Sequence, residues 1–187
     1  MKVVATDLPG VVIVEPDVHR DARGFFLEAY HQRKFAEAGI PGPFVQDNHS
    51  YSVQGTLRGL HAQRIRPQGK LVRAVVGEMF DVAVDVRRGS PTFGKWVGVA
   101  LSGENFRQIY IPPGFVHGFC VLSERLHVEY KCTDFYEAGD EMTVAWNDPE
   151  IGIRWPVTSP VLSAKDAGAP RLAEVLDRLP VFEGDPA

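Results

Sequence analysis

Cysteine is scarce in this sequence, and a long apolar segment is missing. The 187 residues include only Cys120 and Cys132, each inside a short apolar run, so we expect buried free thiols and neither a disulfide framework nor a zinc site. The apolar N-terminal stretch is interrupted by Asp7, Pro9 and Gly10, which argues against a signal-peptide core and a membrane-spanning helix. We therefore expect a cytoplasmic protein.

Acidic residues are absent from the stretch between Asn48 and Gly77. The chain carries a net charge of -4, yet this stretch holds five cations: Arg58, Arg64, Arg66, Lys70 and Arg73. An acidic protein is a poor general binder of nucleic acid or of membrane surfaces, whereas a local excess of cations favours a small anionic ligand. A solvated basic face would explain the charges alone equally well, and His61 among them favours a binding site.

Short runs rich in Val, Phe, Tyr and Thr, separated by Gly and Pro, predict an all-β sandwich or barrel. We expect ten strands, over residues 24–30, 44–53, 57–63, 70–76, 78–86, 95–101, 108–111, 117–122, 126–133 and 141–146. Helices are expected only over residues 32–38 and 170–179, and the second has an apolar stripe that would cap the sheet: Leu172, Val175, Leu176 and Leu179. No repeat or linker divides the chain, so we expect one domain.

Alternation along the strands predicts which side chains share a face. In residues 78–86 the apolar face consists of Phe80, Val82, Val84 and Val86, and the other face carries Asp81 and Asp85. In residues 126–132, Tyr130 shares a face with Leu126, Val128 and Cys132, and His127 points the other way. Tyr130 is therefore either core filler or a hydroxyl directed into a cavity.

Histidines beside glycines are the candidates for chemistry. His61, in RGLH, and His117, in PPGFVHGF, lie on separate strands that a closed sheet would bring together. The chain has no His-x-His pair, and His49 and His127 are isolated, which does not favour a metal site. Motifs of nucleotide and serine hydrolases are absent. His61 as base, Tyr130 as acid and an orienting carboxylate remain as candidates for proton transfer.

Read together, the motifs resemble one family, the dTDP-4-dehydrorhamnose 3,5-epimerases. The similar segments cover nearly the whole chain: DARGFFLEAY (21–30), FVQDNHS (44–50), LRGLH (57–61), QGKLVRAVVGEMFDVAVDVRRGSPTFGKW (68–96), IPPGFVHGF (111–119), EYKCTDFY (129–136), WNDPEIGIRWP (146–156) and LSAKD (162–166). The resemblance implies a cupin-type jelly-roll barrel over about residues 20–157 with a capping segment over 158–187. It also implies a homodimer that needs neither metal nor cofactor.

The resemblance further implies roles for particular residues. His61 would be the base, Tyr130 the acid, Asp166 the hydrogen-bond partner of the base, and Lys70 the donor to the 4-keto oxygen of a dTDP-4-keto-6-deoxyhexose. Nine other residues would line the ligand site, with Tyr136 stacking on the thymine: Arg23, Glu28, Gln46, Asn48, Arg58, His117, Tyr136, Glu141 and Lys165. Strict alternation would turn Arg58 and His61 to opposite faces, so we expect a bulge at Gly59 unless Arg58 reaches the ligand by its length.

The reaction expected from the resemblance is epimerisation of dTDP-4-keto-6-deoxy-D-glucose at carbons 3 and 5. Ala62 replaces the aromatic residue that many members carry after the histidine, and the loop before Lys70 is slightly shortened, so epimerisation at carbon 3 alone is an open alternative. The fold alone would equally suit a keto-isomerase, a non-catalytic sugar-nucleotide-binding module or a metal-dependent oxygenase. The presence of both His61 and Tyr130 favours an epimerase.

Overall fold

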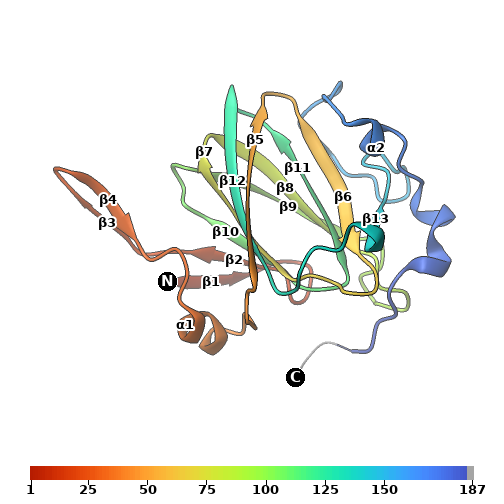
Figure 1. The fold of residues 1–187 in the computed structure, drawn as a ribbon, viewed down its shortest axis with the longest axis horizontal. Helices are drawn as coiled ribbons and strands as arrows, with labels where there is room; N and C mark the ends of the chain where they lie inside the picture. Colours follow the sequence, from red (N-terminus) through yellow and green to blue (C-terminus); the bar gives the residue numbers. More distant parts are fainter. Residues whose placement is uncertain (185–187) are drawn as a thin grey trace.

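The protein, described here by a computed structural model over residues 1–184, is built from two antiparallel sheets that enclose a barrel (Figure 1). The six-stranded sheet has the order β1 (Lys2–Ala5), β2 (Val12–Glu15), β10 (Gln108–Ile111), β7 (Lys70–Val76), β12 (Arg125–Cys132) and β5 (Gln46–Val53). The five-stranded sheet has the order β13 (Glu141–Thr143), β6 (Leu57–Gln63), β11 (Phe115–Val121), β8 (Glu78–Asp85) and β9 (Trp96–Ser102). The expected all-β class is confirmed.

The remaining elements lie outside the barrel. Strands β3 (Val18–Asp21) and β4 (Gly24–Leu27) form a hairpin that projects away from it (Figure 1). Helix α1 (Gln32–Glu37) lies where a helix is predicted. His31 caps its N-terminus, because the ring accepts a hydrogen bond from the amide of Lys34. Helix α2 is Ala164–Ala167, and three short 3-10 turns are η1 (Ala138–Asp140), η2 (Leu172–Glu174) and η3 (Leu176–Arg178).

All ten predicted strands are present, three of them (57–63, 70–76 and 108–111) with the predicted ends and the others with shifted ends, but β1, β2 and β3 are missed by the sequence analysis. Each is only four residues long, which gives alternation too few positions to register. Asp7, Pro9 and Gly10 form the turn between β1 and β2, where the amide of Val11 donates to the carbonyl of Leu8. The six-stranded sheet therefore starts at Lys2 rather than near residue 20.

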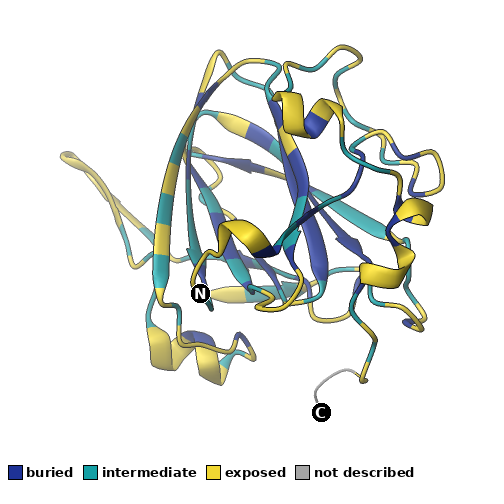
Figure 2. Ribbon diagram, turned by 45° about the vertical axis from the view of Figure 1, so that its right-hand side comes forward, coloured by how far each residue is buried: buried dark blue, intermediate teal, exposed yellow. Residues whose placement is uncertain are grey.

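Both faces of the five-stranded sheet are buried, which corrects the prediction for β8. Its aspartate-bearing face points into the barrel, where Met79 and Ala83 pack with Leu126 and Val128 of the facing sheet. The opposite, fully apolar face lies under the segment after β13; it consists of Phe80, Val82 and Val84, continued by Val86. Figure 2 shows the central strands mostly buried and the peripheral helices mostly exposed. Strand β12 agrees with expectation, since Tyr130 packs at the edge of the barrel core.

The predicted C-terminal helix over 170–179 is wrong, because the segment forms the two separate turns η2 and η3. Its amides find partners outside a helix: the N–H of Leu172 donates to Asp148 and that of Arg171 to Glu174. Between the turns, the β-branched Val175 adopts φ -120°. The segment nevertheless covers the sheet as expected, with Val175 buried and Leu176 exposed.

Two glycines allow strands β6 and β11 to approach closely. A Cβ on Gly59, which has φ +140°, would lie 2.6 Å from the Cα of Gly118, and a Cβ on Gly118 would lie 2.7 Å from the carbonyl oxygen of Arg58. The pairing shifts register at this point, from His117 opposite His61 to Phe119 opposite Arg58. Two residues of β6 therefore face one residue of β11, which defines a bulge.

Replacing Gly59 by alanine tests this close approach. We expect Gly59→Ala to lower the free energy of unfolding by about 2–4 kcal/mol, because the added methyl group meets backbone and the positive φ is strained. Denaturant unfolding would measure it. Gly139→Ala is the matched control, since a Cβ on Gly139 would have no atom within 4 Å. Equal stability of the two variants would contradict the packing described here.

Candidate active site

His61 and Asp166 lie 105 residues apart in the sequence and meet at the mouth of the barrel. Nε2 of His61 lies 2.6 Å from Oδ1 of Asp166. The other carboxylate oxygen, Oδ2, accepts a hydrogen bond of 2.9 Å from the hydroxyl of Ser163, which also caps helix α2 through the amide of Asp166. Because a carboxylate only accepts, the ring nitrogen facing it carries the proton, and in the neutral ring the other nitrogen holds a lone pair.

The bulge expected at Gly59 is confirmed, and it brings Arg58 to the same side as His61. Both residues line a cavity of about 440 Å³ between β6 and the segment that carries Asp166. Nε of Arg58 donates to the hydroxyl of Ser52 at 3.0 Å, which holds the guanidinium beside the barrel mouth.

The opposite wall of the site comes from the six-stranded sheet. Tyr130 pairs with Asn48 of β5 and with Val72 of β7, and Cys132 pairs with Lys70. The side chains of Tyr130 and Cys132 point into the barrel, because they continue the buried face of β12. His61 and Tyr130 therefore approach the site from different sheets.

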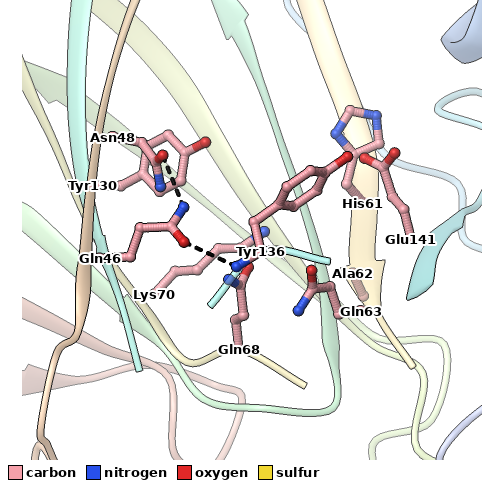
Figure 3. Close-up of a pocket in the computed structure, with 10 residues that line it drawn as sticks. All are labelled: Gln46, Asn48, His61, Ala62, Gln63, Gln68, Lys70, Tyr130, Tyr136 and Glu141. Atoms are coloured by element: carbon pink, nitrogen blue, oxygen red, sulfur yellow. Dashed lines mark hydrogen bonds between the residues drawn. The ribbon is translucent and has the colours of Figure 1, made fainter. Parts of the chain in front are cut away.

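A polar pocket of about 310 Å³ lies between these walls (Figure 3). It is lined by Gln46, Asn48, His61, Ala62, Gln63, Gln68, Lys70, Tyr130, Tyr136 and Glu141. The amide of Gln46 donates to Asn48 at 3.0 Å, and its carbonyl oxygen accepts from the backbone N–H of Tyr136 at 2.9 Å. Gln46 thus anchors the segment that places Tyr136 over the pocket.

Two further side-chain contacts border the pocket. Nζ of Lys165 lies 2.8 Å from Glu141, next to the contact between His61 and Asp166. His117, directly opposite His61 on β11, places its Nε2 2.8 Å from Oδ2 of Asp81. Lys70 forms no salt bridge within the part of the chain that the structure describes.

Burial shifts the protonation equilibria of three site residues. Desolvation lowers the pKa of His61 below its usual value, and the neighbouring Asp166 opposes this by favouring the imidazolium. Desolvation likewise lowers the pKa of Lys70. The charges of Cys132, Asp81 and Glu141 act in the opposite direction and raise it. Desolvation raises the pKa of Tyr130, whereas the positive charge of Arg58 acts to lower it. The site thus favours a neutral imidazole and a protonated phenol.

Eleven of the thirteen residues expected from the sequence gather around the barrel mouth, and Arg23 and Glu28 do not. Arg23 lies at the turn of the β3–β4 hairpin, where its side chain is 90% exposed and paired with Asp21. Glu28 pairs with Lys34 and lines a second cavity, on the outer face of the six-stranded sheet, which shares only Asn48 and Tyr130 with the pocket. Within one chain, neither belongs to the pocket.

Three residues near the site were missed by the sequence analysis. Gln63 and Gln68 line the pocket, and Asp81 holds His117. Alternation predicts the face of Gln63, because it lies two residues beyond His61 on β6. The pairing of Asp81 with His117 depends on tertiary structure, and no local pattern indicates it.

Two findings concern residues 1–184 only. Within this range no three His, Cys, Asp or Glu side chains converge in a way that could hold a metal ion. None of the helices in the same range is long and apolar enough to cross a membrane.

The fold and site define a jelly-roll barrel with a polar, partly cationic pocket and a histidine–aspartate pair opposite a tyrosine. The family model of dTDP-4-dehydrorhamnose 3,5-epimerases matches residues 5–174, and the chain belongs to this family. The epimerases of that name from Pseudomonas aeruginosa and Shigella flexneri are 58% and 55% identical to the chain. These matches cover 89% and 93% of the chain and 93% and 97% of the relatives, respectively.

A solved structure extends the similarity to the whole barrel. The dTDP-6-deoxy-D-glucose-3,5-epimerase of Legionella pneumophila, in complex with dTDP-4-keto-L-rhamnose, has a TM-score of 0.95 and 48% sequence identity. The match covers 98% of this chain and 99% of that one. The expected family, its epimerase class and the jelly-roll fold are thus confirmed.

The contact between His61 and Asp166 should be visible in the pKa of His61. We expect the pKa of His61 to lie below its usual value of about 6.5 and to fall further in Asp166→Asn, because the variant removes the charge that favours the imidazolium. Histidine ring NMR across pH would measure both values. The exposed His19, on the β3–β4 hairpin, is the internal control, and its ring signals should be the same in both proteins. A rise of the His61 pKa in the variant would contradict the assigned contact.

Proposed function

We propose that the protein epimerises dTDP-4-keto-6-deoxy-D-glucose at carbons 3 and 5, giving dTDP-4-keto-L-rhamnose. The observation that carries the proposal is the placement of a proton acceptor, His61 with Asp166, and a proton donor, Tyr130, on different sheets around one pocket. Inversion at carbon requires removal of a proton from one face and delivery to the other. The epimerases similar to this chain, named for both carbons, support the double reaction.

The pocket offers complementary groups for each part of the substrate. Arg58 and Lys165 supply positive charge at the mouth for the diphosphate, where charge-assisted hydrogen bonds are strong. Tyr136, half exposed over the pocket, offers a ring face to the thymine. Hydrogen-bonding groups at the remaining positions would contact the nucleoside and sugar: Gln46, Asn48, His117 and Glu141.

The chemistry follows from the acidity of a carbon-bound proton beside a ketone. The neutral ring of His61 takes the proton, and Asp166 stabilises the imidazolium that results. Negative charge then develops on the 4-keto oxygen, where the ammonium of Lys70 donates a hydrogen bond. Tyr130 delivers a proton to the opposite face of the enolate. Solvent then takes the proton from His61 and returns one to Tyr130, so that a second cycle can invert the other carbon. No step calls for a metal or cofactor.

A homodimer is part of the proposal, because it accounts for the two residues that lie outside the pocket. The hairpin that carries Arg23 also exposes Phe25 and Phe26, by 56% and 70% respectively, which is costly for large aromatic rings left in water. The outer face of the six-stranded sheet is similarly exposed at Tyr51 and Val53. A second copy covering these surfaces would bring Arg23 and Glu28 to its partner's site.

The remaining aspects of the proposal concern organisation and location. We assign residues 1–187 to one epimerase domain, of which 185–187 lie outside the described residues. Cys120 and Cys132 are buried free thiols, which supports a reducing, cytoplasmic environment.

Separate substitutions of the base and the acid test the mechanism. We expect His61→Asn to lower kcat by about 10²–10⁴-fold while dTDP binding, measured by calorimetry, stays close to wild type. Tyr130→Phe should lower kcat by a similar factor of about 10²–10⁴ but still exchange substrate protons with solvent, because the base is intact. His31→Asn is the control, since His31 caps helix α1 outside the pocket and asparagine is also a good helix cap. Full activity of His61→Asn would refute the assigned base.

Mixed dimers test whether partners share sites. Arg23→Ala and His61→Asn should each be nearly inactive alone. If the hairpin serves the partner, unfolding and refolding an equimolar mixture should restore about a quarter of wild-type activity, because half of the dimers then contain one intact site. Mixing wild type with His61→Asn controls for refolding losses. An inactive mixture, together with a monomeric mass by sedimentation, would rule out the dimeric arrangement.

A further inference from the structure

Asp81 is a buried carboxylate inside the barrel that the mechanism above leaves unused. It lies on β8 with 0% of its surface exposed. Oδ2 receives the hydrogen bond from His117 at 2.8 Å, whereas Oδ1 has no hydrogen-bond partner among residues 1–184. A buried carboxylate oxygen without a partner is costly, so a positive charge nearby would stabilise it.

Lys70 points into the same interior from the facing sheet, because it lies directly opposite the inward-facing Cys132 of β12 and lines the pocket. The groups whose charge acts on its ammonium are Asp81 on β8, Cys132 on β12 and Glu141 on β13. Other titratable groups around the same pocket are His61, Tyr130 and Tyr136. Glu141 already pairs with Lys165 at 2.8 Å, and burial raises the pKa of the Cys132 thiol, which keeps it neutral. Asp81 is therefore the nearby carboxylate with an unoccupied oxygen.

The chemistry of Lys70 depends on its charge. A neutral amine is a weaker donor to a developing oxyanion than an ammonium. Burial acts against the ammonium by lowering the pKa of Lys70, and Asp81 acts in the opposite direction. The same carboxylate orders His117: since Nε2 of that ring donates to Asp81, its Nδ1 is an acceptor when the ring is neutral.

We propose that Asp81 is a positioning residue that keeps the ammonium of Lys70 charged through the enolate step and fixes the hydrogen-bonding direction of His117. Its effect on turnover rests on the proposed epimerase function, whereas its effect on the charge of Lys70 does not. Asp81 acts through these two side chains and has no contact with the reacting carbons.

Asp81→Asn tests the proposal by removing the charge while keeping the size of the side chain. We expect the alkaline limb of the kcat profile to move to lower pH by about one unit, because Lys70 loses a buried counter-charge. KM should change little. If Asp81 were merely structural, its substitution would lower kcat at every pH and would not move the alkaline limb. Asp81→Ser, which is smaller and still accepts from His117, provides a second neutral variant if the first folds poorly.

Lys70→Arg identifies the group that produces the limb. A guanidinium stays charged throughout the accessible pH range, so adding Asp81→Asn to Lys70→Arg should no longer move the limb. Any limb that remains belongs to another group, such as Tyr130, whose pKa is raised chiefly by burial. An equal shift in both backgrounds would overturn the proposal.

Labelling of Lys70 separates this proposal from the proposed function. Competitive acetylation with acetic anhydride across pH, read by peptide mass spectrometry, reports the charge of Lys70 without substrate. We expect its titration to move to lower pH in Asp81→Asn and to stay unchanged in Asp148→Asn. Asp148 is the matched control, because it is also buried but binds the amides of Glu150, Ile151 and Leu172 outside the pocket.

The outcomes are distinguishable. If wild-type protein fails to turn over dTDP-4-keto-6-deoxy-D-glucose but Lys70 still titrates lower in Asp81→Asn, the proposed function fails and the link between Asp81 and Lys70 stands. If wild-type protein is active but neither the limb nor the labelling moves in the variant, the role of Asp81 is overturned and the epimerase function stands.

Discussion

The cost of taking charged side chains out of water governs the interior of this barrel. Each buried aspartate that faces the site has a histidine against it: Asp166 contacts His61, and Asp81 contacts His117. These pairings offset a desolvation cost that an isolated carboxylate could not sustain. Lys70 has no such contact in the described part of the chain, and desolvation lowers its pKa. An anionic substrate that develops charge at its keto oxygen would meet this cation inside the barrel.

Backbone features far apart in the sequence place these side chains. Gly59 and Gly118 allow β6 and β11 to approach, and the bulge between them turns Arg58 and His61 to the same side. The segment after β13 covers the apolar face of the five-stranded sheet and then delivers Asp166 to the barrel mouth. Covering the sheet and completing the histidine–aspartate pair are thus tasks of one segment, so a change that loosens its packing should also disturb the base.

Much of this arrangement could be predicted from the sequence, and the failures have physical causes. Strand alternation placed Tyr130 inside the barrel, and the need for Arg58 beside His61 pointed to the bulge. Alternation could not say that both faces of β8 are buried, because that depends on what packs outside the sheet. The C-terminal helix failed since tertiary hydrogen bonds to Asp148 replaced helical ones. Arg23 was assigned to the site, but within one chain it lies exposed on the β3–β4 hairpin and pairs with Asp21.

The central claim is that one pocket removes and returns protons at two carbons beside the ketone. The most direct measurement is to incubate the protein with dTDP-4-keto-6-deoxy-D-glucose in deuterated water and to follow both carbons by NMR. We expect deuterium at carbons 3 and 5 together with inversion at both. Deuterium at carbon 3 alone would contradict the double reaction and direct attention to Ala62, which lines the pocket beside the base. No exchange at either carbon, with substrate bound, would contradict the account as a whole.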